Sequence, residues 1–253
     1  MKYHYVFMSS WDHLNEAIYG DILHLVNVEF LEAPVNNWSI KLMKFLPNPL
    51  KFLWNKKFYN KKTDESICFI FRMSSMMRGR ELLFRYLKKR YKKCKFVAYL
   101  GDVIASRPYA DLSLLDQYFD LVFSFDKGDC EKYRKHHLIY FPTMYSKQKI
   151  EDSSAFAESD IFFCGKAKDR HDYIAELYKH FTAAGVRCDF NISSLNSGDN
   201  LVEGINYIEK MEYKEYLQHL AKSTCLLDVM QGESKGFTLR VWEALVYGKT
   251  DYH

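Results

Sequence analysis

The sequence predicts an α/β protein of two consecutive domains, each a doubly wound parallel sheet flanked by helices. Three observations predict this fold class. Short apolar runs alternate with amphipathic helical patterns along the chain. A polar stretch at residues 146–159 separates two such series. The length of 253 residues allows two modest domains, and apolar and charged contents of 48% and 27% are those of a folded protein.

The first series predicts a Rossmann-like domain over residues 1–148. Alternating strands and helices imply parallel pairing with right-handed crossovers. Residues 36–62 show no clean period and are expected to be irregular. The expected strands are 2–8, 22–30, 67–73, 95–104, 121–125 and 138–141, and the expected helices are 78–93, 112–118 and one opened by Asp126 or Asp129 as N-cap.

The second series predicts another Rossmann-like domain over residues 160–253, after a linker at 149–159. A helix that follows Gly165 should end at Gly185, because glycine favours helix C-termini. A strand is expected after Gly248, yet the chain ends at His253, so we expect this domain to be truncated at its C-terminus. The other expected strands are 160–164, 187–192, 204–208 and 225–230, with helices at 213–221 and 239–245.

Cysteine usage and hydropathy predict a cytoplasmic location. The six cysteines are dispersed, without a CxxC pair, and several lie in apolar runs, which favours free thiols in a reducing compartment. No apolar run reaches the roughly 18 residues of a membrane span, and residues 2–8 are too short for the apolar core of a signal peptide.

Positive charge is concentrated in two runs. Either run could be a solvated face. No nucleic-acid-binding module is found in the sequence, so no nucleic-acid partner is expected. The first run is interleaved with aromatic residues, a composition typical of a segment that rests on an anionic membrane surface, here the inner face of the cell membrane. The runs are Lys51, Lys56, Lys57, Lys61 and Lys62, and then Lys88, Lys89, Arg90, Lys92, Lys93 and Lys95.

Two turns of the second domain are candidate anion sites. Ligands of open parallel sheets bind beyond the carboxyl ends of the strands, often at a helix N-terminus. In the first turn, Gly165 would permit a tight turn from which Lys166 and Arg170 reach a diphosphate. The alternative is a polar turn with incidental surface cations.

The second turn precedes the helix expected at 239–245. Gly236 would let the backbone approach a ligand, and Thr238 can cap the helix. Arg240 lies in the first helical turn, where the helix dipole favours an acid, so a bound diphosphate would explain it; a solvent-exposed arginine is the alternative. Glu243 lies one turn further on and could accept both hydroxyls of a ribose.

These residues carry a resemblance to a known family. The segment resembles the donor-binding segment of GT-B glycosyltransferases, especially bacterial lipopolysaccharide and capsular polysaccharide biosynthesis proteins with a Gly-Phe-Thr-Leu-Arg motif. Many relatives place a glutamate before the Gly-Phe pair, where this chain has Lys235. The resemblance is specific over about the last twenty residues. It rests on Gly236-Phe237-Thr238-Leu239-Arg240-Val241-Trp242-Glu243-Ala244-Leu245 followed by Gly248-Lys249.

The resemblance implies a glycosyltransferase that moves a sugar, of the hexosyl class, from a nucleotide-diphosphate sugar to a cell-envelope glycan or lipid-linked glycan. The nucleotide would occupy the second domain, with Glu243 on the ribose, and the acceptor the first, with chemistry in the cleft. Asp12 or His13, after the first strand, is the candidate general base, and Asp102 a second one. Asp12 could instead cap the following helix.

No metal and no tightly bound cofactor are expected, because the chain has no Asp-x-Asp motif. The charge of the leaving diphosphate would then be met by Lys166, Arg170, Arg240 and the helix N-terminus. Two alternatives remain. One is a truncated, non-catalytic GT-B-like nucleotide-binding protein. The other is an unrelated nucleotide-binding protein, which is disfavoured because the sequence has no Gly-x-Gly-x-x-Gly motif and no Walker A motif.

Overall fold

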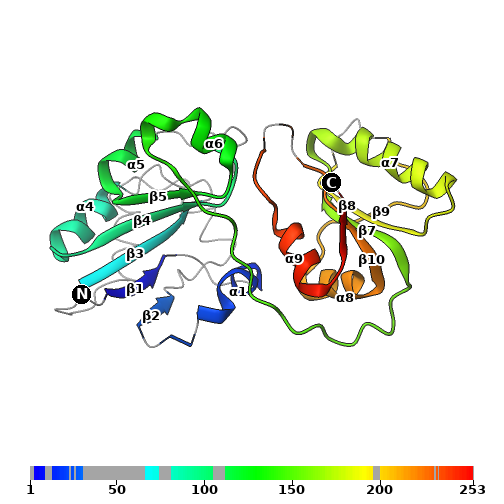
Figure 1. Cartoon of the computed structure of the whole chain (residues 1–253), viewed down its shortest axis with the longest axis horizontal. Helices are drawn as coiled ribbons and strands as arrows, with labels where there is room; N and C mark the ends of the chain where they lie inside the picture. The colour runs from blue at the N-terminus through cyan, green and yellow to red at the C-terminus, as the bar shows by residue number, and fades with distance from the viewer. Residues whose placement is uncertain are drawn as a thin grey trace. The chain divides into compact units, whose positions relative to one another are not determined.

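The computed structural model shows two compact units (Figure 1). Unit 1 consists of residues 1–146 together with 233–236, and unit 2 of residues 147–232 together with 237–253. The structure describes residues 3–8, 13–22, 24–25, 27–30, 66–73, 81–104, 112–195, 200–230, 232 and 234–252.

Unit 1 contains a six-stranded parallel sheet in the order β2-β1-β3-β4-β5-β6. Because β1 lies between β2 and β3, the strand order reverses there, as in doubly wound folds. The strands are β1 (Tyr3–Phe7), β2 (Val28–Phe30), β3 (Ser66–Met73), β4 (Lys95–Leu100), β5 (Leu121–Ser124) and β6 (Ile139–Tyr140). The helices are α1 (His13–Tyr19), α4 (Glu81–Arg90), α5 (Ser113–Tyr118) and α6 (Lys127–Lys132).

An aromatic core fills one face of this sheet. Phe71 of β3 packs edge-on against Phe84 of α4, at 5.3 Å between ring centroids, and against Phe119 after α5, at 5.4 Å. Edge-to-face pairs of this kind add to the free energy of burial. On the other face, Phe7 of β1 packs on Tyr19 of α1 at 5.0 Å. Helices therefore cover both faces (Figure 1).

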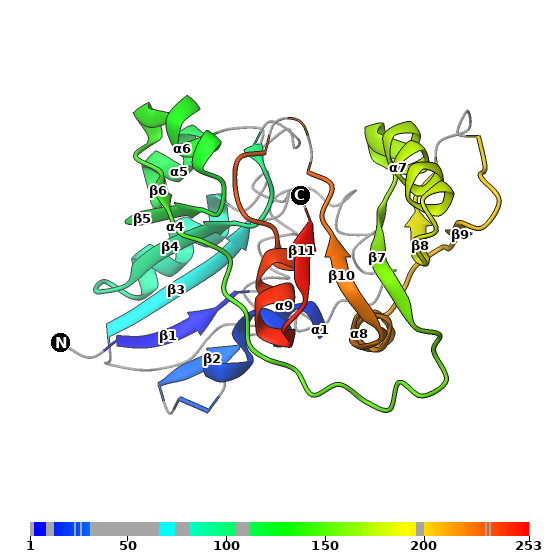
Figure 2. The ribbon, with the colours of Figure 1, turned by 45° about the vertical axis from the view of Figure 1, so that its right-hand side comes forward.

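Unit 2 contains a five-stranded parallel sheet in the order β11-β10-β7-β8-β9. Figure 2 shows its strands running side by side in one direction. The order reverses at β7, so the crevice at the carboxyl ends of β7 and β10 is the expected ligand position of such a sheet. The strands are β7 (Ser159–Lys166), β8 (Cys188–Ser193), β9 (Asn206–Tyr207), β10 (Ser223–Leu227) and β11 (Thr250–Tyr252); the helices are α7 (His171–Ala183), α8 (Tyr213–Lys222) and α9 (Leu239–Tyr247).

Two cores lie on opposite faces of the unit 2 sheet, because successive side chains of a strand alternate between faces. Phe163 packs with Ile174 of α7 in one core. Phe162 packs with Leu217 of α8 and Ala244 of α9 in the other. The sheet is thus covered by α7 on one side and by α8 and α9 on the other (Figure 1).

The loop between β10 and α9 contributes residues 233–236 to unit 1. Its anchor is the fully buried carboxylate of Asp126, whose Oδ2 accepts from the Ser234 hydroxyl at 2.8 Å and from the amides of Lys235 and Gly236 at 2.7 and 2.9 Å. Its Oδ1 accepts from the Asp129 amide and caps α6. Asp126, not Asp129, is therefore the N-cap.

Most expected elements are confirmed, but several bounds differ: β4 ends at Leu100 and not at residue 104, and β10 spans Ser223–Leu227 and not 225–230. Residues 22–30 do not form one strand: residues 20–22 form a 3-10 turn and only Val28–Phe30 pair with β1. β7 continues past its expected end at residue 164 to Lys166. The strand expected after Gly248 is β11. All six cysteines are free. Among the described helices, none has the length and apolar character needed to cross a membrane.

Candidate functional site

Polar side chains converge at the carboxyl ends of β7 and β10 in unit 2. Asp228 follows β10 directly, and its side chain is completely buried. Its Oδ2 accepts a hydrogen bond from the Thr238 hydroxyl, and its Oδ1 accepts from Nη1 of Arg240 at 3.1 Å. Thr238 also accepts from the Arg240 amide at 3.2 Å, which confirms it as the N-cap of α9. Asp228 therefore fixes the start of α9 to the end of β10.

Arg240 fixes the same helix to β7. Its Nη2 donates to the carbonyl oxygen of Cys164, and its guanidinium lies over the ring of Phe163, 5.5 Å from the centroid. A cation at this helix N-terminus is thus compensated by Asp228 and is 20% exposed. It is not the solvent-exposed arginine of the alternative interpretation.

Gly165 lies inside β7, opposite Ile192 of β8, and forms no tight turn. A Cβ atom at this position would lie 2.8 Å from Nη2 of Arg240 and 3.2 Å from Cζ of Phe163. The expectation of a turn was wrong, and the physical reason for the glycine is different. It leaves room for the Arg240 guanidinium against the strand.

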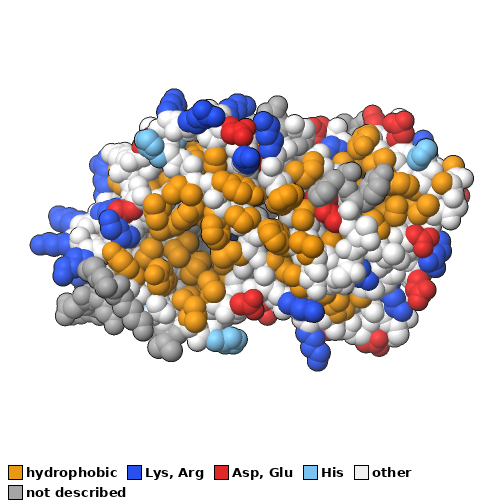
Figure 3. Space-filling view, viewed as in Figure 1, with side chains coloured by type: hydrophobic (Ala, Val, Ile, Leu, Met, Phe, Trp, Pro, Cys, Tyr) orange, Lys and Arg blue, Asp and Glu red, His pale blue; other side chains and the backbone are white. Residues whose placement is uncertain are grey.

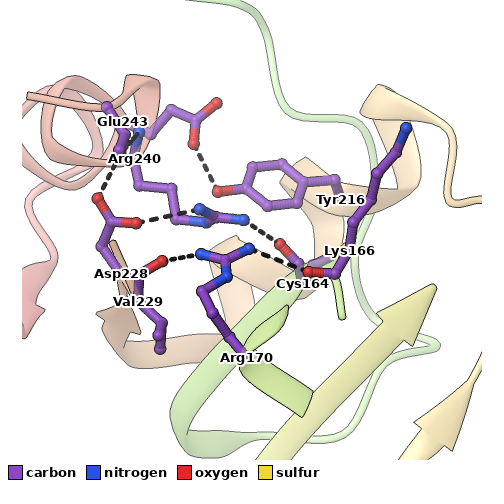
Figure 4. Close-up of polar contacts among 9 residues, drawn as sticks. Cys164, Lys166, Arg170, Tyr216, Asp228, Val229, Arg240 and Glu243 are labelled. Atoms are coloured by element: carbon purple, nitrogen blue, oxygen red, sulfur yellow. Dashed lines mark hydrogen bonds and ion pairs between the residues drawn. The ribbon is translucent and has the colours of Figure 1, made fainter. Parts of the chain in front are cut away.

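Arg170 lies beside Arg240 at this edge (Figure 4). Its Nη1 donates to the carbonyl of Val229, and its Nη2 donates to the carbonyl of Lys166 at 3.0 Å. Within the described part of the chain, no carboxylate forms an ion pair with it. Burial and the charge of Arg240 lower the pKa of Arg170. The Nε atoms of both arginines are buried without a partner among the described residues. Positive charge at this edge is therefore incompletely compensated.

Lys166 is exposed and extends away from the two guanidinium groups (Figure 4). It lines an open pocket of about 690 Å³ at the carboxyl ends of β7 and β8. Because Cys164 and Gly165 belong both to the pocket wall and to the surroundings of Arg240, the pocket adjoins the arginine pair. Its other lining residues are Ser193, Ser194, Ile208, Glu209, Lys210 and Met211.

Glu243 is only 2% exposed, and both oxygens of its carboxylate accept hydrogen bonds. The Tyr213 hydroxyl donates to Oε1 at 2.7 Å, and the Tyr216 hydroxyl donates to Oε2 at 2.5 Å. Burial raises the pKa of Glu243, although the two tyrosine hydrogen bonds and the nearby charge of Arg240 oppose this. Burial and the adjacent carboxylate likewise raise the pKa of Tyr216 well above its ordinary value.

The two residues of the Gly-Phe pair before α9 differ in exposure. Gly236 is buried, and a Cβ there would lie 2.4 Å from the Phe125 carbonyl oxygen and 2.9 Å from the Asp126 Cα. The close backbone approach that this glycine permits is thus to the chain itself. Phe237 is 53% exposed.

The candidate bases lie in or next to parts of unit 1 that the structure does not describe. Asp12 and the lysine-rich segment 51–62 are outside the described residues. His13 begins α1, but its side chain is also outside them. Asp102 is half-buried just after β4, at the carboxyl edge of the unit 1 sheet. Among the described residues, no group of three His, Cys, Asp or Glu side chains could hold a metal ion.

Three residues of this site were not predicted from the sequence: Asp228, Tyr213 and Tyr216. Asp228 carries a detectable signal, since it is an acid directly after an apolar strand, where ligand-binding and buried polar groups collect. The two tyrosines are three residues apart and therefore share one face of α8. Their pairing with Glu243, 27 and 30 residues away, has no sequence signal.

Comparisons with known proteins give a fold relationship. No protein-family model matches the sequence, and no curated protein sequence matches it. Solved structures do match, and two of them are 13% identical to this chain, each over 90% of this chain and 73% of the other. One is an alpha-glucosyltransferase in complex with UDP-glucose and DNA containing an abasic site (TM-score 0.50). The other is an alpha-glucosyltransferase in complex with UDP and a 13-mer DNA (TM-score 0.53).

These matches and the two parallel sheets confirm the expected fold class, two Rossmann-like parallel-sheet domains of the GT-B type. Unit 2 has the strand order of a dinucleotide-binding fold, with its polar crevice where that order reverses. At 13% identity, the matches establish fold alone.

Proposed function

We propose that this chain is a GT-B glycosyltransferase whose nucleotide-diphosphate sugar binds at the carboxyl edge of the unit 2 sheet. The observation that carries the proposal is Arg170. It is a half-buried cation next to a second one, and its hydrogen-bond partners in the described structure are carbonyls. Burying a charge is costly unless it is compensated. A diphosphate would supply the missing negative charge.

The position of the arginines fits a diphosphate ligand. They lie at the switch point of the sheet, where ligands of such folds bind, and beside the N-terminus of α9, whose dipole favours anions. Guanidinium groups match phosphate oxygens with paired hydrogen bonds. The adjoining pocket, with Lys166 at its rim, is large enough for the nucleoside or sugar.

The neighbours and the resemblance support the donor class. The two matching structures are complexes of alpha-glucosyltransferases with UDP-glucose and with UDP. The motif from Gly236 to Leu245 resembles donor-binding segments of envelope polysaccharide enzymes. On these grounds we propose hexosyl transfer without a metal, onto a cell-envelope glycan or lipid-linked glycan, by a cytoplasmic enzyme at the inner membrane face.

In this mechanism the arginine pair, Lys166 and the start of α9 would stabilise charge on the leaving diphosphate. Asp12 or His13 would take the proton of the acceptor hydroxyl. Substituting Asp12→Asn or His13→Gln should then lower kcat without changing nucleotide affinity. A variant of either residue with full activity would remove that residue as the base.

The proposal is tested by thermal shift with UDP, GDP, CDP and dTDP. A ligand that binds the folded state raises its melting temperature, and one nucleotide should do so selectively. Arg170→Gln should then weaken binding of that nucleotide by about 1.5–3 kcal/mol, the range of a hydrogen bond to a charged group. Lys179→Ala, an exposed lysine on α7, is the control for net charge. No shift with any nucleotide would refute the proposal.

A non-catalytic nucleotide-binding protein is the main alternative and shares the same site. Both interpretations predict a thermal shift, but only a transferase breaks the bond between sugar and diphosphate. Release of free nucleotide from the selected nucleotide sugar, in the presence of a membrane or glycan extract, distinguishes them. Binding without any release would favour the non-catalytic protein.

A DNA acceptor is a second candidate, which departs from the expectation of no nucleic-acid partner. Both matching structures contain DNA. Unit 1 also exposes Lys89, Arg90, Lys92 and Lys93, and Figure 3 shows basic side chains gathered at the α4 end of the molecule. Phosphate contacts of this kind make affinity fall steeply with salt. Binding of duplex DNA that weakens with salt and with Lys92→Ala/Lys93→Ala would favour it over the glycan acceptor.

A further inference from the structure

The carboxylate of Glu243 is closed off by residues of its own chain. Both oxygens accept a tyrosine hydroxyl, and the side chain is almost completely buried, so no acceptor atom faces solvent. A carboxylate that is to receive ligand hydroxyls must first be uncovered. Either Glu243 receives no ligand, or one of the two tyrosines moves.

The two tyrosines differ in how firmly they are held. Tyr216 is 8% exposed and packs on Phe162 in the core beneath α8, with ring centroids 5.3 Å apart. Tyr213 is half-buried and stacks on Tyr216 at 5.6 Å, with the ring planes 12° apart. Tyr213 packs only at the edge of that core, so its departure costs less packing than the departure of Tyr216.

The backbone around Tyr213 also favours movement. Tyr213 is the first residue of α8, and the preceding residue, Glu212, provides no side-chain cap for the helix. Helix ends fray, and an uncapped first turn is the least stable part of a helix. Rotation of the Tyr213 side chain thus gives up its hydrogen bond to Glu243 and its packing at the edge of the core, and leaves Tyr216 in place.

We propose that Tyr213 is an internal substitute for a ribose hydroxyl, which must leave Glu243 when a ribonucleoside diphosphate binds. The proposal rests on the function proposed above and adds a specificity-determining residue to it. A ribose offers two neighbouring hydroxyls, of which one would replace the phenol on Oε1. Tyr216 would stay on Oε2 and keep the carboxylate oriented.

This exchange lowers the apparent affinity of the wild-type protein. One hydrogen bond to a carboxylate is lost as another forms, so the ribose contact yields little net free energy. In population terms, the protein that is ready to bind is a minor fraction, and the observed Kd equals the intrinsic Kd divided by that fraction. Removing the Tyr213 hydroxyl should remove this penalty.

The test is the Kd of UDP, GDP and CDP, measured by calorimetry, for the wild-type chain and Tyr213→Phe. The best of the three should bind Tyr213→Phe at least about fivefold more tightly. Tyr247→Phe is the matched control, because the Tyr247 hydroxyl accepts from the amide of Gln148 and donates to its carbonyl, so its loss should leave nucleotide affinity unchanged. In a Glu243→Gln background, Tyr213→Phe should have no effect, since the shared partner is altered.

The outcomes separate this inference from the proposed function. If the wild-type chain binds a nucleotide and Tyr213→Phe binds it equally or more weakly, Tyr213 does not compete and this inference alone fails. An equal gain in the Glu243→Gln background would also overturn it. Binding seen only with Tyr213→Phe would support both proposals. Binding by neither protein would overturn both.

Discussion

Nη1 of Arg240 lies 3.1 Å from Oδ1 of Asp228, and this ion pair joins the first turn of α9 to the end of β10. Asp228 is fully buried, so its charge depends on Arg240 and on the Thr238 hydroxyl for compensation. Breaking a buried pair by removing one partner is costly, because the other charge stays buried. The pair therefore stabilises the candidate donor site as well as the fold.

Asp228→Asn should lower the free energy of unfolding by about 3 kcal/mol. This is the lower end of the range for a broken buried pair, because Arg240 keeps its hydrogen bond to the carbonyl oxygen of Cys164. Urea denaturation measures the change. Asp160→Asn is the control: Asp160 pairs with Arg187 at the surface, where water screens the charges, so this substitution should have a much smaller effect. Equal effects of the two substitutions would show that the buried Asp228 pair contributes no more to the free energy of unfolding than the exposed Asp160 pair.

Gly165→Ala should impair nucleotide binding more than stability. The added Cβ would meet Nη2 of Arg240, at the far end of a long side chain, and the guanidinium can shift at a cost of about 1 kcal/mol. The displaced guanidinium would then be about tenfold weaker as a phosphate partner. Calorimetric titration together with urea denaturation checks both parts. Unchanged affinity for nucleotide would show that Arg240 is not part of the donor site.

Gly236→Ala should have the opposite profile, because its added Cβ meets backbone atoms of Phe125 and Asp126 that cannot move independently. We expect a loss of about 2–3 kcal/mol in unfolding free energy, typical of overpacking. Gly232→Ala is a matched control in the same loop, with no atom within 4 Å of the new Cβ. If both substitutions were neutral, the contact of residues 233–236 with Asp126 would not contribute to stability.

The hydrogen bonds of Asp120 predict that the stability of unit 1 depends on pH. Burial alone would raise the pKa of this carboxyl, but hydrogen bonds from Lys95, the Phe96 amide and Lys88 outweigh it and lower the pKa from 3.8 to about 2. The unfolded chain therefore binds more protons between these values, and the stabilisation is present above pH 3.8 and lost as the pH falls through 2.

The comparison of wild type with Asp120→Asn tests this. The substitution should cost about 1 kcal/mol near pH 7, a value limited by solvent screening of partly exposed pairs, and the difference should vanish toward pH 2. Urea denaturation across this pH range gives the curve. A cost independent of pH would mean that hydrogen-bond geometry, not charge, sets the role of Asp120.

Much of the architecture could be predicted because it depends on local patterns. The apolar run that became β3 and the glycine that ends α7 each act through neighbouring residues. The start of α9 was predictable for the same reason, since Thr238 caps its own helix. The strand predicted over residues 22–30 was wrong, because an apolar run of this length does not distinguish a strand from a 3-10 turn followed by a short strand.

The internal connections of the site could not be predicted because they join residues far apart in the sequence. Arg240 contacts Cys164 across 76 positions, and Tyr216 contacts Glu243 across 27. A single sequence gives the residue types but not which polar groups satisfy one another. Lys249 is a further example: its Nζ donates to the carbonyls of Ala221 and Ser223 at the end of α8, which gives the Gly-Lys turn a structural reason.

The assignment of residues 233–236 to unit 1 has a consequence for dissecting the protein. A polypeptide of residues 1–146 lacks four residues of its own unit, and the Asp126 carboxylate would lose the three donors that they supply. The complementary piece, residues 147–253, carries those donors. Co-expression of the two fragments should therefore yield more folded protein than the first fragment alone, which makes the peptide bond after Ser146 a rational point for split-protein complementation.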